Sequence, residues 1–231
     1  MVTCIVAATE DELARIKEEL AARLDRPSFG GAWYSGNLSR LPIYLGVVGV
    51  GIVSAAVTLG SLLAQIKVDR VIMIGSAGAL PGSGLDVGDV AVASSETLAE
   101  LGICVGEGVG ESESLNIPGL NQTISLAEDL SKSMAEATDK SFRISRGAFL
   151  SVAGVSSSQS HALARASRFG ALVENMEGYA LALAGERFGI TVAEVRGVSN
   201  HAGVRDKSAW NLDLANQRAQ SVVLNYLRRQ L

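Results

Sequence analysis

The sequence predicts an α/β fold of three layers, with helices covering both faces of a central sheet. Runs typical of strands alternate with helical runs along the chain, which is the pattern of a layered strand–helix domain. Several of the strand runs are apolar throughout, as expected where both faces of a sheet are covered. With 231 residues, 48% of them hydrophobic and 19% charged, residues 1–231 are expected to form one globular domain.

The predicted elements follow these runs in order. Strands are expected at Thr3–Ala8, Ile43–Val48, Arg70–Ile74, Val87–Ser94, Gly147–Val152, Leu172–Glu174 and Thr191–Val198. Helices are expected at Glu10–Leu24, Ile52–Gln65, Thr123–Ala137, Ser157–Arg168, Met176–Phe188 and Leu212–Arg229. Polar side chains that accept hydrogen bonds from backbone amides favour helix N-termini. Thr9 or Asp11 is therefore expected to cap the first helix, and Ser156 or Ser157 the fourth.

Two long segments need a separate interpretation. Leu41–Ile66 carries no charge and is long enough to cross a bilayer. Because one proline and four glycines interrupt it, a strand, a glycine turn and a helix are the preferred interpretation. Gly102–Gly119 is rich in glycine and glutamate, and we expect a surface loop there that serves as a lid or an oligomer contact.

The charge and cysteine content exclude several function classes. A net charge of −4 offers no basic surface to nucleic acid or to an anionic membrane, so neither is expected as a partner. Cys4 and Cys104 leave a disulfide possible, but no ligand spacing suggests a metal, and neither a metal nor a cofactor is expected. The first residues lack the pattern of a signal peptide, so a reduced, cytoplasmic compartment is expected.

Two glycine-rich segments follow predicted strands. Gly46–Gly51 leads into a helix and is either a phosphate cradle or a tight turn. A dinucleotide-binding fold is disfavoured, because such a turn should follow the first strand. Gly75–Ala79 follows the strand Arg70–Ile74, and its small residues would let backbone amides approach a ligand oxygen. The carboxyl ends of strands are also where α/β sheets bind ligands.

Acidic and polar residues mark three further strand ends. Glu10, Asp11 and Glu12 stand at the start of the first predicted helix, where the helix dipole favours solvated carboxylates. Glu10 and Asp11 are expected to be such surface charges, whereas Glu12 would be a functional residue if the end of the first strand borders a site. Glu177 lies at a strand-to-helix corner, where a carboxylate either accepts hydrogen bonds from a diol or caps the helix. Asn200, with Ser199 before it, is either a turn former or a binding residue.

Taken in their order along the chain, these two glycine-rich segments and three polar strand ends resemble the nucleoside phosphorylase and nucleosidase superfamily. The resemblance covers nearly the whole chain. The matching motifs are Ala7–Glu12, Val48–Gly51, Gly75–Gly78, Met176–Glu177 and Ser199–Asn200. The resemblance implies a phosphorylase-like three-layer fold with a central mixed, largely parallel sheet. It also implies a small-molecule purine nucleoside as substrate and a homodimer or higher homo-oligomer.

Within the superfamily, three tracts resemble the futalosine hydrolase family, whose members remove hypoxanthine from futalosine in an alternative menaquinone pathway. They are Glu174–Gly178, Arg196–Asn200 and Gly203–Trp210. The chain departs from the expected pattern at Tyr179, at His201–Ala202 and at Val204, which concerns the shape of the pocket more than the reaction.

The resemblance assigns roles residue by residue. Glu12 is expected to be the general base on the attacking water. Ser76 and Gly78 would hold that water and the ribose, with Glu177 accepting from ribose hydroxyls and Met176 packing on the sugar. The residues expected at the base are Phe149, Leu150, Ser199 and Asn200; for Phe149, a place in the core is the alternative.

Residue 200 is expected to distinguish one purine from another. A 6-oxopurine presents acceptors at O6 and N7; an amide NH₂ can donate to them, whereas an ionised carboxylate only accepts. Asn200 therefore favours hypoxanthine or guanine over adenine, because mismatched polar groups are strongly penalised. The alternative, a methylthioadenosine or adenosylhomocysteine nucleosidase, would need aspartate there. Phosphorylases of the superfamily carry an arginine where this chain has Met73, so water is the expected nucleophile.

Overall fold

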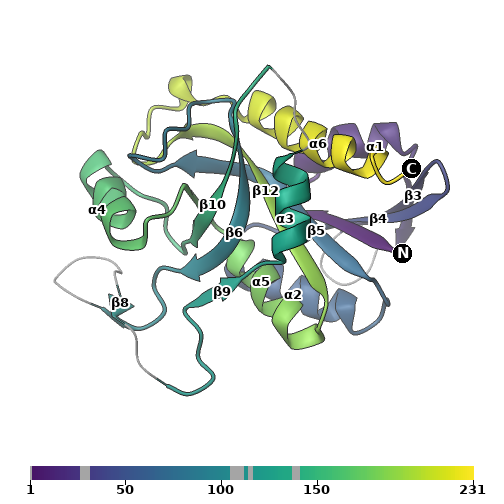
Figure 1. The fold of residues 1–231 in the computed structure, drawn as a ribbon, viewed down its shortest axis with the longest axis horizontal. Helices are drawn as coiled ribbons and strands as arrows, with labels where there is room; N and C mark the ends of the chain where they lie inside the picture. Colours follow the sequence, from purple (N-terminus) through teal and green to yellow (C-terminus); the bar gives the residue numbers. More distant parts are fainter. Residues whose placement is uncertain (1, 27–31, 105–111, 114–116, 137–140) are drawn as a thin grey trace.

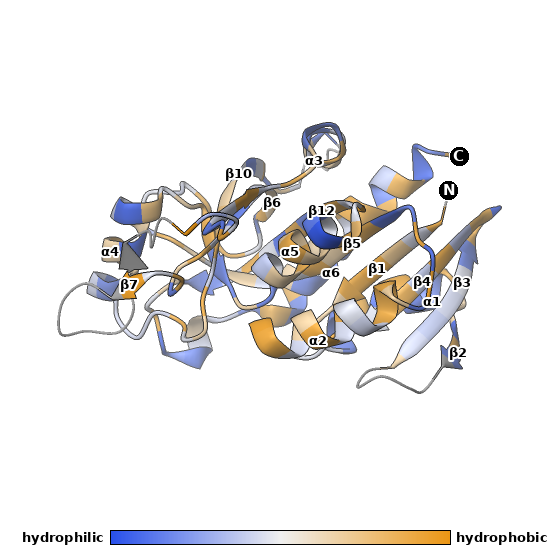
Figure 2. Ribbon diagram, turned by 90° about the horizontal axis from the view of Figure 1, so that it is seen from below, coloured by the Kyte–Doolittle hydropathy of each residue, from blue (hydrophilic) through white to orange (hydrophobic). Residues whose placement is uncertain are grey.

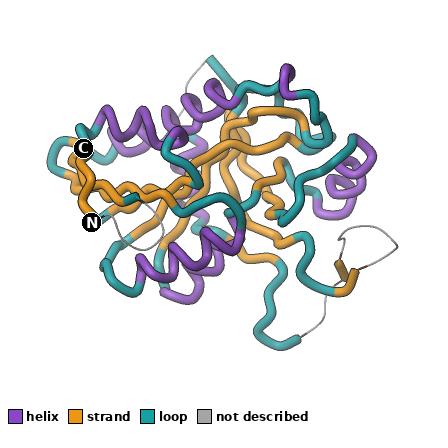
Figure 3. The backbone as a smooth tube through the Cα atoms, turned by 180° about the vertical axis from the view of Figure 1, so that it is seen from behind, coloured by secondary structure: helices purple, strands orange, loops and turns teal. Residues whose placement is uncertain are grey.

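The computed structural model has the three layers that the sequence predicts, and it describes residues 2–26, 32–104, 112–113, 117–136 and 141–231. Helices α1, α3 and α6 lie on one side of the central sheet and α2 and α5 on the other, with α4 at one end (Figure 1). The helices are α1 (Ala14–Glu19), α2 (Ile52–Leu63), α3 (Glu128–Ala135), α4 (Gln159–Phe169), α5 (Gly178–Phe188) and α6 (Leu212–Arg228), with two short 3-10 helices, η1 (Asp11–Leu13) and η2 (Lys207–Ala209). Both described chain ends lie at the same end of the molecule (Figure 3).

The central sheet is mixed. Its strands are β1 (Thr3–Ala7), β2 (Arg23–Arg26), β3 (Trp33–Leu38), β4 (Leu41–Val47), β5 (Arg70–Ala79), β6 (Val90–Leu98), β9 (Thr123–Ser125), β10 (Ile144–Ser151), β11 (Val173–Asn175) and β12 (Thr191–His201). They are ordered β11-β10-β6-β12-β5-β1-β4-β3-β2, with β9 on β6. Strand β5 pairs in parallel with β1 and β12, and its far end also pairs with β11. One half of the sheet therefore curls until β11 returns to β5.

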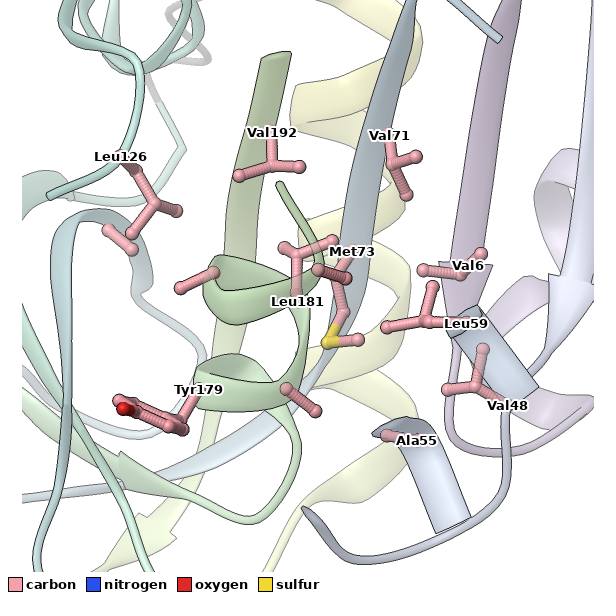
Figure 4. Close-up of a cluster of buried hydrophobic side chains, with 14 of the residues drawn as sticks. Val6, Val48, Ala55, Leu59, Val71, Met73, Leu126, Tyr179, Leu181 and Val192 are labelled. Atoms are coloured by element: carbon pink, nitrogen blue, oxygen red, sulfur yellow. The ribbon is translucent and has the colours of Figure 1, made fainter. Parts of the chain in front are cut away.

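Two apolar clusters fill the space between the layers. One joins the sheet to α2 and α5 and includes Leu59, Met73 and Leu181 (Figure 4). The other joins the opposite face to α1, α3 and α6. Figure 2 shows the central strands as predominantly hydrophobic, as expected for strands covered on both faces. Burying each large aliphatic side chain contributes about 1.5–3 kcal/mol, so these clusters hold the strand ends that form the site.

The structure corrects the N-terminal helix and part of the third. The predicted helix Glu10–Leu24 is a 3-10 turn followed by α1, which ends at Glu19, and Arg23 already begins β2. The predicted helix Thr123–Ala137 begins five residues late, because Thr123–Ser125 pairs with β6 as β9 instead.

The predicted helix caps are also corrected. Neither Thr9 nor Asp11 caps α1; the Thr9 hydroxyl donates to Glu12 instead. Helix α4 is capped by Ser158, which accepts from the amide of His161, while Ser156 is bound to Glu174.

The two long segments resolve differently. Leu41–Ile66 is a strand, a glycine turn and a helix, as predicted, and no helix among the described residues is long and apolar enough to cross a membrane. Within Gly102–Gly119, short strands β7 (Ile103–Cys104) and β8 (Ser112–Glu113) pair with each other. Residues 105–111 and 114–116 lie outside the described residues, so the predicted lid or oligomer contact stays a prediction.

Candidate active site

A cavity of about 410 Å³ opens where the carboxyl ends of several strands meet. Its wall is built from the residues after β1, the far half of β5, the corner between β11 and α5, and the end of β12. Seven predicted site residues line it: Glu12, Ser76, Gly78, Met176, Glu177, Ser199 and Asn200. The fold therefore brings together motifs that are up to 188 residues apart in the sequence, from Glu12 to Asn200.

Glu12 is a buried carboxyl group at one end of this cavity, with 7% of its surface exposed. Its Oε1 accepts from the amide of Ser76 at 3.1 Å, and its Oε2 accepts from the amide of Thr9 at 3.1 Å. Burial raises the pKa of Glu12, and the nearby Arg196 guanidinium opposes that shift. A Cβ on residue 75 would lie 2.5 Å from Arg196 Nη1 and 2.8 Å from Glu12 Oε1, so a larger residue there would displace both site side chains.

Arg196 lines the cavity, and no role was predicted for it from the sequence. Its side chain is buried and donates from Nε to Glu194 Oε1 at 2.7 Å. Its Nη2 pairs with Glu177 Oε2 at 3.1 Å, and its Nη1 donates to the carbonyl of Ser76 at 3.3 Å. Burial alone would lower the pKa of Arg196, but the three carboxylates around it raise that pKa above its ordinary value. The guanidinium therefore stays charged; it pairs with Glu177 and interacts electrostatically with Glu12.

A sequence signal for Arg196 does exist. Glu194 and Arg196 stand two residues apart in the otherwise apolar stretch Val192–Val198 of β12, so they share a face of the sheet. Unpaired charges are very costly inside a protein, and two opposite charges in a buried strand indicate a buried ion pair. The partners Glu12 and Glu177, however, come from other elements, which only the tertiary fold shows.

Glu177 is held at the first turn of α5 by three separate segments. Its Oε1 accepts from the amide of Gly51 at 2.9 Å, so the glycine turn after β4 contributes to the binding of this carboxylate. Asn175 Oδ1 accepts from the amides of Glu177 and Gly178 at 3.0 and 2.8 Å and fixes the corner. This leaves a buried, charge-paired carboxylate facing the cavity beside Met176, as expected for a group that accepts hydrogen bonds from a diol.

Asn200 lies at the other end of the cavity, just after an irregularity in β12. The register of β12 on β5 shifts between Val198 and Asn200, and such a bulge redirects side chains. Asn200 Oδ1 accepts from the Ser199 hydroxyl at 2.8 Å, and Nδ2 donates to the carbonyl of His201 at 3.0 Å. An amide nitrogen has two hydrogens, so this network leaves one N–H of Asn200 to donate into the cavity, near Gly78.

Comparison with known proteins shows the family of this chain. The family described as "Phosphorylase superfamily" matches residues 3–228. The chain is 34% identical to futalosine hydrolase of Thermus thermophilus, over 79% of this chain and 78% of the relative. It is 33% identical to futalosine hydrolase of Acidothermus cellulolyticus, over 75% and 70% respectively. The chain belongs to the phosphorylase superfamily and, within it, to the futalosine hydrolase family.

A solved structure supports the fold of this futalosine hydrolase family member. The methylthioadenosine/adenosylhomocysteine nucleosidase of Streptococcus pneumoniae, bound to a transition-state inhibitor, superposes with a TM-score of 0.87. It is 22% identical in sequence, and the match covers 100% of both chains. At this identity the likeness concerns the fold alone.

Two predicted base-binding residues of this family member lie outside the cavity wall. Both are fully buried in β10: Phe149 belongs to the cluster that includes α2 and α5, and Leu150 to a third, smaller cluster that includes Ala162 of α4. Strand β10 pairs with both β6 and β11, and core residues enclose both side chains, so the expected contact of these two residues with a base stays a prediction. Val155, in the loop after β10, lines the cavity instead.

A buried ion-pair network sets the path of the loop that carries Val155. Arg165 of α4 donates to Glu174 Oε2 at 3.0 Å and to the carbonyl of Gly154 at 2.9 Å. Ser156 donates to Glu174 through its amide and its hydroxyl, at 3.0 and 2.6 Å. The loop is thereby bound to both α4 and β11, which directs Val155 into the cavity.

Proposed function

We propose that this chain hydrolyses the N-glycosidic bond of futalosine, releasing hypoxanthine and dehypoxanthine futalosine in menaquinone biosynthesis. The observation that carries the proposal is the pairing, within one cavity, of a buried carboxylate at one end and a donating amide at the other. Glu12 is the carboxylate and Asn200 the amide. The membership in the futalosine hydrolase family supports this substrate.

The groups of the cavity match the charges that develop in such a reaction. Cleavage builds positive charge on the ribose and negative charge on the leaving base. Glu12 would take a proton from the water that attacks C1′ as the bond from C1′ to the base breaks. Glu177 would accept from the ribose hydroxyls, and its negative charge lies near the developing cation. The free N–H of Asn200 would donate to the departing 6-oxopurine.

The electrostatics of Arg196 favour water over phosphate as the nucleophile. Arg196 lines the cavity and could in principle bind an anionic nucleophile there. Its positive charge is, however, already offset by the carboxylates of Glu194, Glu177 and Glu12. A phosphate bound beside Arg196 would also lie near the cavity-lining carboxylates of Glu12 and Glu177. Its negative charge would be repelled by theirs. Met73, at the position that phosphorylases use for arginine, packs beneath Arg196 with its sulfur 3.4 Å from Nη2.

A panel of three nucleosides tests the proposal against its rival. Futalosine, inosine and methylthioadenosine are incubated with the protein in phosphate-free buffer, and the released base is identified by chromatography. The proposal predicts hypoxanthine from futalosine and little or no adenine. Release of adenine alone would replace it by the methylthioadenosine or adenosylhomocysteine nucleosidase activity, and no release at all would favour a non-catalytic nucleoside-binding module.

Arg205 is the cavity-lining cation that we propose for the far, carboxylate-bearing end of the substrate. Its guanidinium lies 5.0 Å from the ring centroid of Trp210, whose Nε1 donates to the carbonyl of Val204 at 3.0 Å. Among the described residues, no ion pair of Arg205 is present, so its charge is available to a ligand. Both Arg205 and Trp210 line the cavity.

Replacing Arg205 by alanine is expected to raise the KM for futalosine about 10-fold, as for the loss of one charge-assisted hydrogen bond. The KM for inosine, which lacks that end, should not change. Lys207→Ala, which removes an exposed cation nearby but outside the cavity wall, is the matched control. Equal KM increases for both nucleosides in steady-state assays would contradict this role.

We further propose a cytoplasmic homodimer or larger homo-oligomer. Val53 and Val57 lie one turn apart on α2 with 77% and 68% of their surfaces exposed, and Val50 before them lines the cavity. Exposed apolar patches often mark protein contacts, and a second copy placed there would cover the cavity rim. Sedimentation of the purified chain should give a mass of at least two copies; a monomer at assay concentration would contradict the proposal.

A further inference from the structure

Two carboxyl groups, of Glu96 on β6 and Glu194 on β12, lie buried side by side beneath the start of α5. Neither side chain has any exposed surface. A Cβ on Gly178 would lie 2.1 Å from Glu96 Oε1 and 2.3 Å from Glu194 Oε2. The two oxygens therefore face the same point of the α5 backbone, and only glycine at position 178 leaves room for both.

The two groups have different surroundings. Glu96 accepts from neutral donors only, the Ser151 hydroxyl at 2.7 Å and Asn175 Nδ2 at 2.6 Å. Glu194 Oε1 accepts from the Arg196 guanidinium at 2.7 Å, whereas its Oε2 is buried and has no hydrogen-bond partner in the described part of the chain. Two adjacent buried carboxylates cannot both remain ionised, because each destabilises the charge of the other.

The surroundings decide which group carries the proton. Burial raises the pKa of Glu96 well above its ordinary value, and the neighbouring Glu194 raises it further. The Arg196 guanidinium, 2.7 Å from Glu194 Oε1, stabilises a negative charge on Glu194, whereas among the described residues no cation contacts Glu96. A proton on Glu96 also supplies the donor that Glu194 Oε2 otherwise lacks. The pair then has a single negative charge on Glu194, whose Oε1 contacts Arg196.

We propose that Glu96 and Glu194 share one proton and act together as positioning residues for Arg196. The inference rests on the proposed function. Ionised Glu194 accepts from Nε of Arg196 and thereby orients the guanidinium. In this orientation Nη1 donates to the Ser76 carbonyl and Nη2 pairs with Glu177. The charge of Glu194 also offsets the effect of Arg196 on Glu12, which keeps Glu12 basic enough to accept a proton. Glu96 contributes by being neutral and by donating to Glu194.

Two isosteric variants separate these roles. Glu194→Gln removes the charge beside Arg196, so Arg196 stabilises ionised Glu12 more strongly. The acid limb of kcat/KM for futalosine should move to lower pH, and kcat should fall about 10-fold or more, because proton transfer depends on the pKa of the base. Glu96→Gln replaces a neutral acid by a neutral amide, so the acid limb should stay in place and kcat should remain within about 10-fold of wild type. An equal shift of the acid limb in both variants would overturn the assignment.

An infrared measurement of the whole protein tests the shared proton without any activity. Wild type at neutral pH should show the C=O band of a protonated carboxyl group, Glu96→Gln should lose it, and Glu194→Gln should keep it at a shifted frequency. Absence of the band in active wild type would overturn this inference alone. Presence of the band in a protein that releases no base would instead overturn the proposed function. If Glu194→Gln does not fold, Glu194→Asp keeps the charge and should keep the acid limb while lowering kcat.

Discussion

Glu12→Gln is expected to lower kcat for futalosine hydrolysis by about 10²–10⁴-fold, the usual contribution of a general base, with substrate binding largely kept. Glutamine has nearly the same shape, and its carbonyl oxygen can accept from either the Ser76 or the Thr9 amide. It cannot take a proton from water. Steady-state kcat and direct binding of an unreactive nucleoside, measured on the same preparation, separate catalysis from affinity.

The pH dependence of wild type supplies a second readout of the same group. Because burial raises the pKa of Glu12, the acid limb of kcat/KM should lie above the pH at which an exposed glutamate titrates, near 4.3. Activity should be complete above that limb and fall as the pH decreases through it. Glu10→Gln is the matched control, since Glu10 is exposed and paired with Lys17 outside the cavity. Wild-type turnover in Glu12→Gln would refute the assigned role.

Asn200→Asp is expected to shift base preference from hypoxanthine towards adenine, changing the ratio of kcat/KM values by at least about 10²-fold. A carboxylate accepts from the amino group of adenine, and in its ionised form it repels the acceptors O6 and N7 of a 6-oxopurine. Futalosine and methylthioadenosine are assayed side by side with wild type and variant. Asn37→Asp, an exposed change of the same kind on β3, should leave the ratio unaltered.

The result for Asn200→Asp also discriminates between two roles of the residue. If Asn200 only stabilises the bulge of β12, the variant should lose activity on both nucleosides to a similar extent. A constant selectivity ratio would therefore contradict base recognition by Asn200. A gain on methylthioadenosine, however small, requires that the side chain contact the base.

Much of the fold could be predicted because its strands and helices have clear periodicity. The predicted strand Thr3–Ala8 is an uncharged, mostly apolar run, and α5 and α6 begin within two residues of their predicted positions. The misses have physical causes. Strands β2 and β3 lie at the sheet edge, where half-exposed residues lack the apolar run of a central strand.

The site was predictable where one segment carries the signal, as at Glu12, Glu177 and Asn200. It was not predictable where burial depends on several segments. Arg196 and Glu96 acquire their surroundings only when β6, β12 and α5 pack together. The expected contact of Phe149 with the base stays a prediction, and the path of the loop beyond it depends on Arg165, a residue of another element whose contacts the local sequence does not reveal.

The most direct test of the proposed reaction is futalosine cleavage by the wild-type protein in phosphate-free buffer, with both products quantified. Hydrolysis by water predicts hypoxanthine and dehypoxanthine futalosine in equal amounts, at a rate that added phosphate does not increase. A requirement for phosphate, or formation of a sugar phosphate in place of dehypoxanthine futalosine, would contradict it.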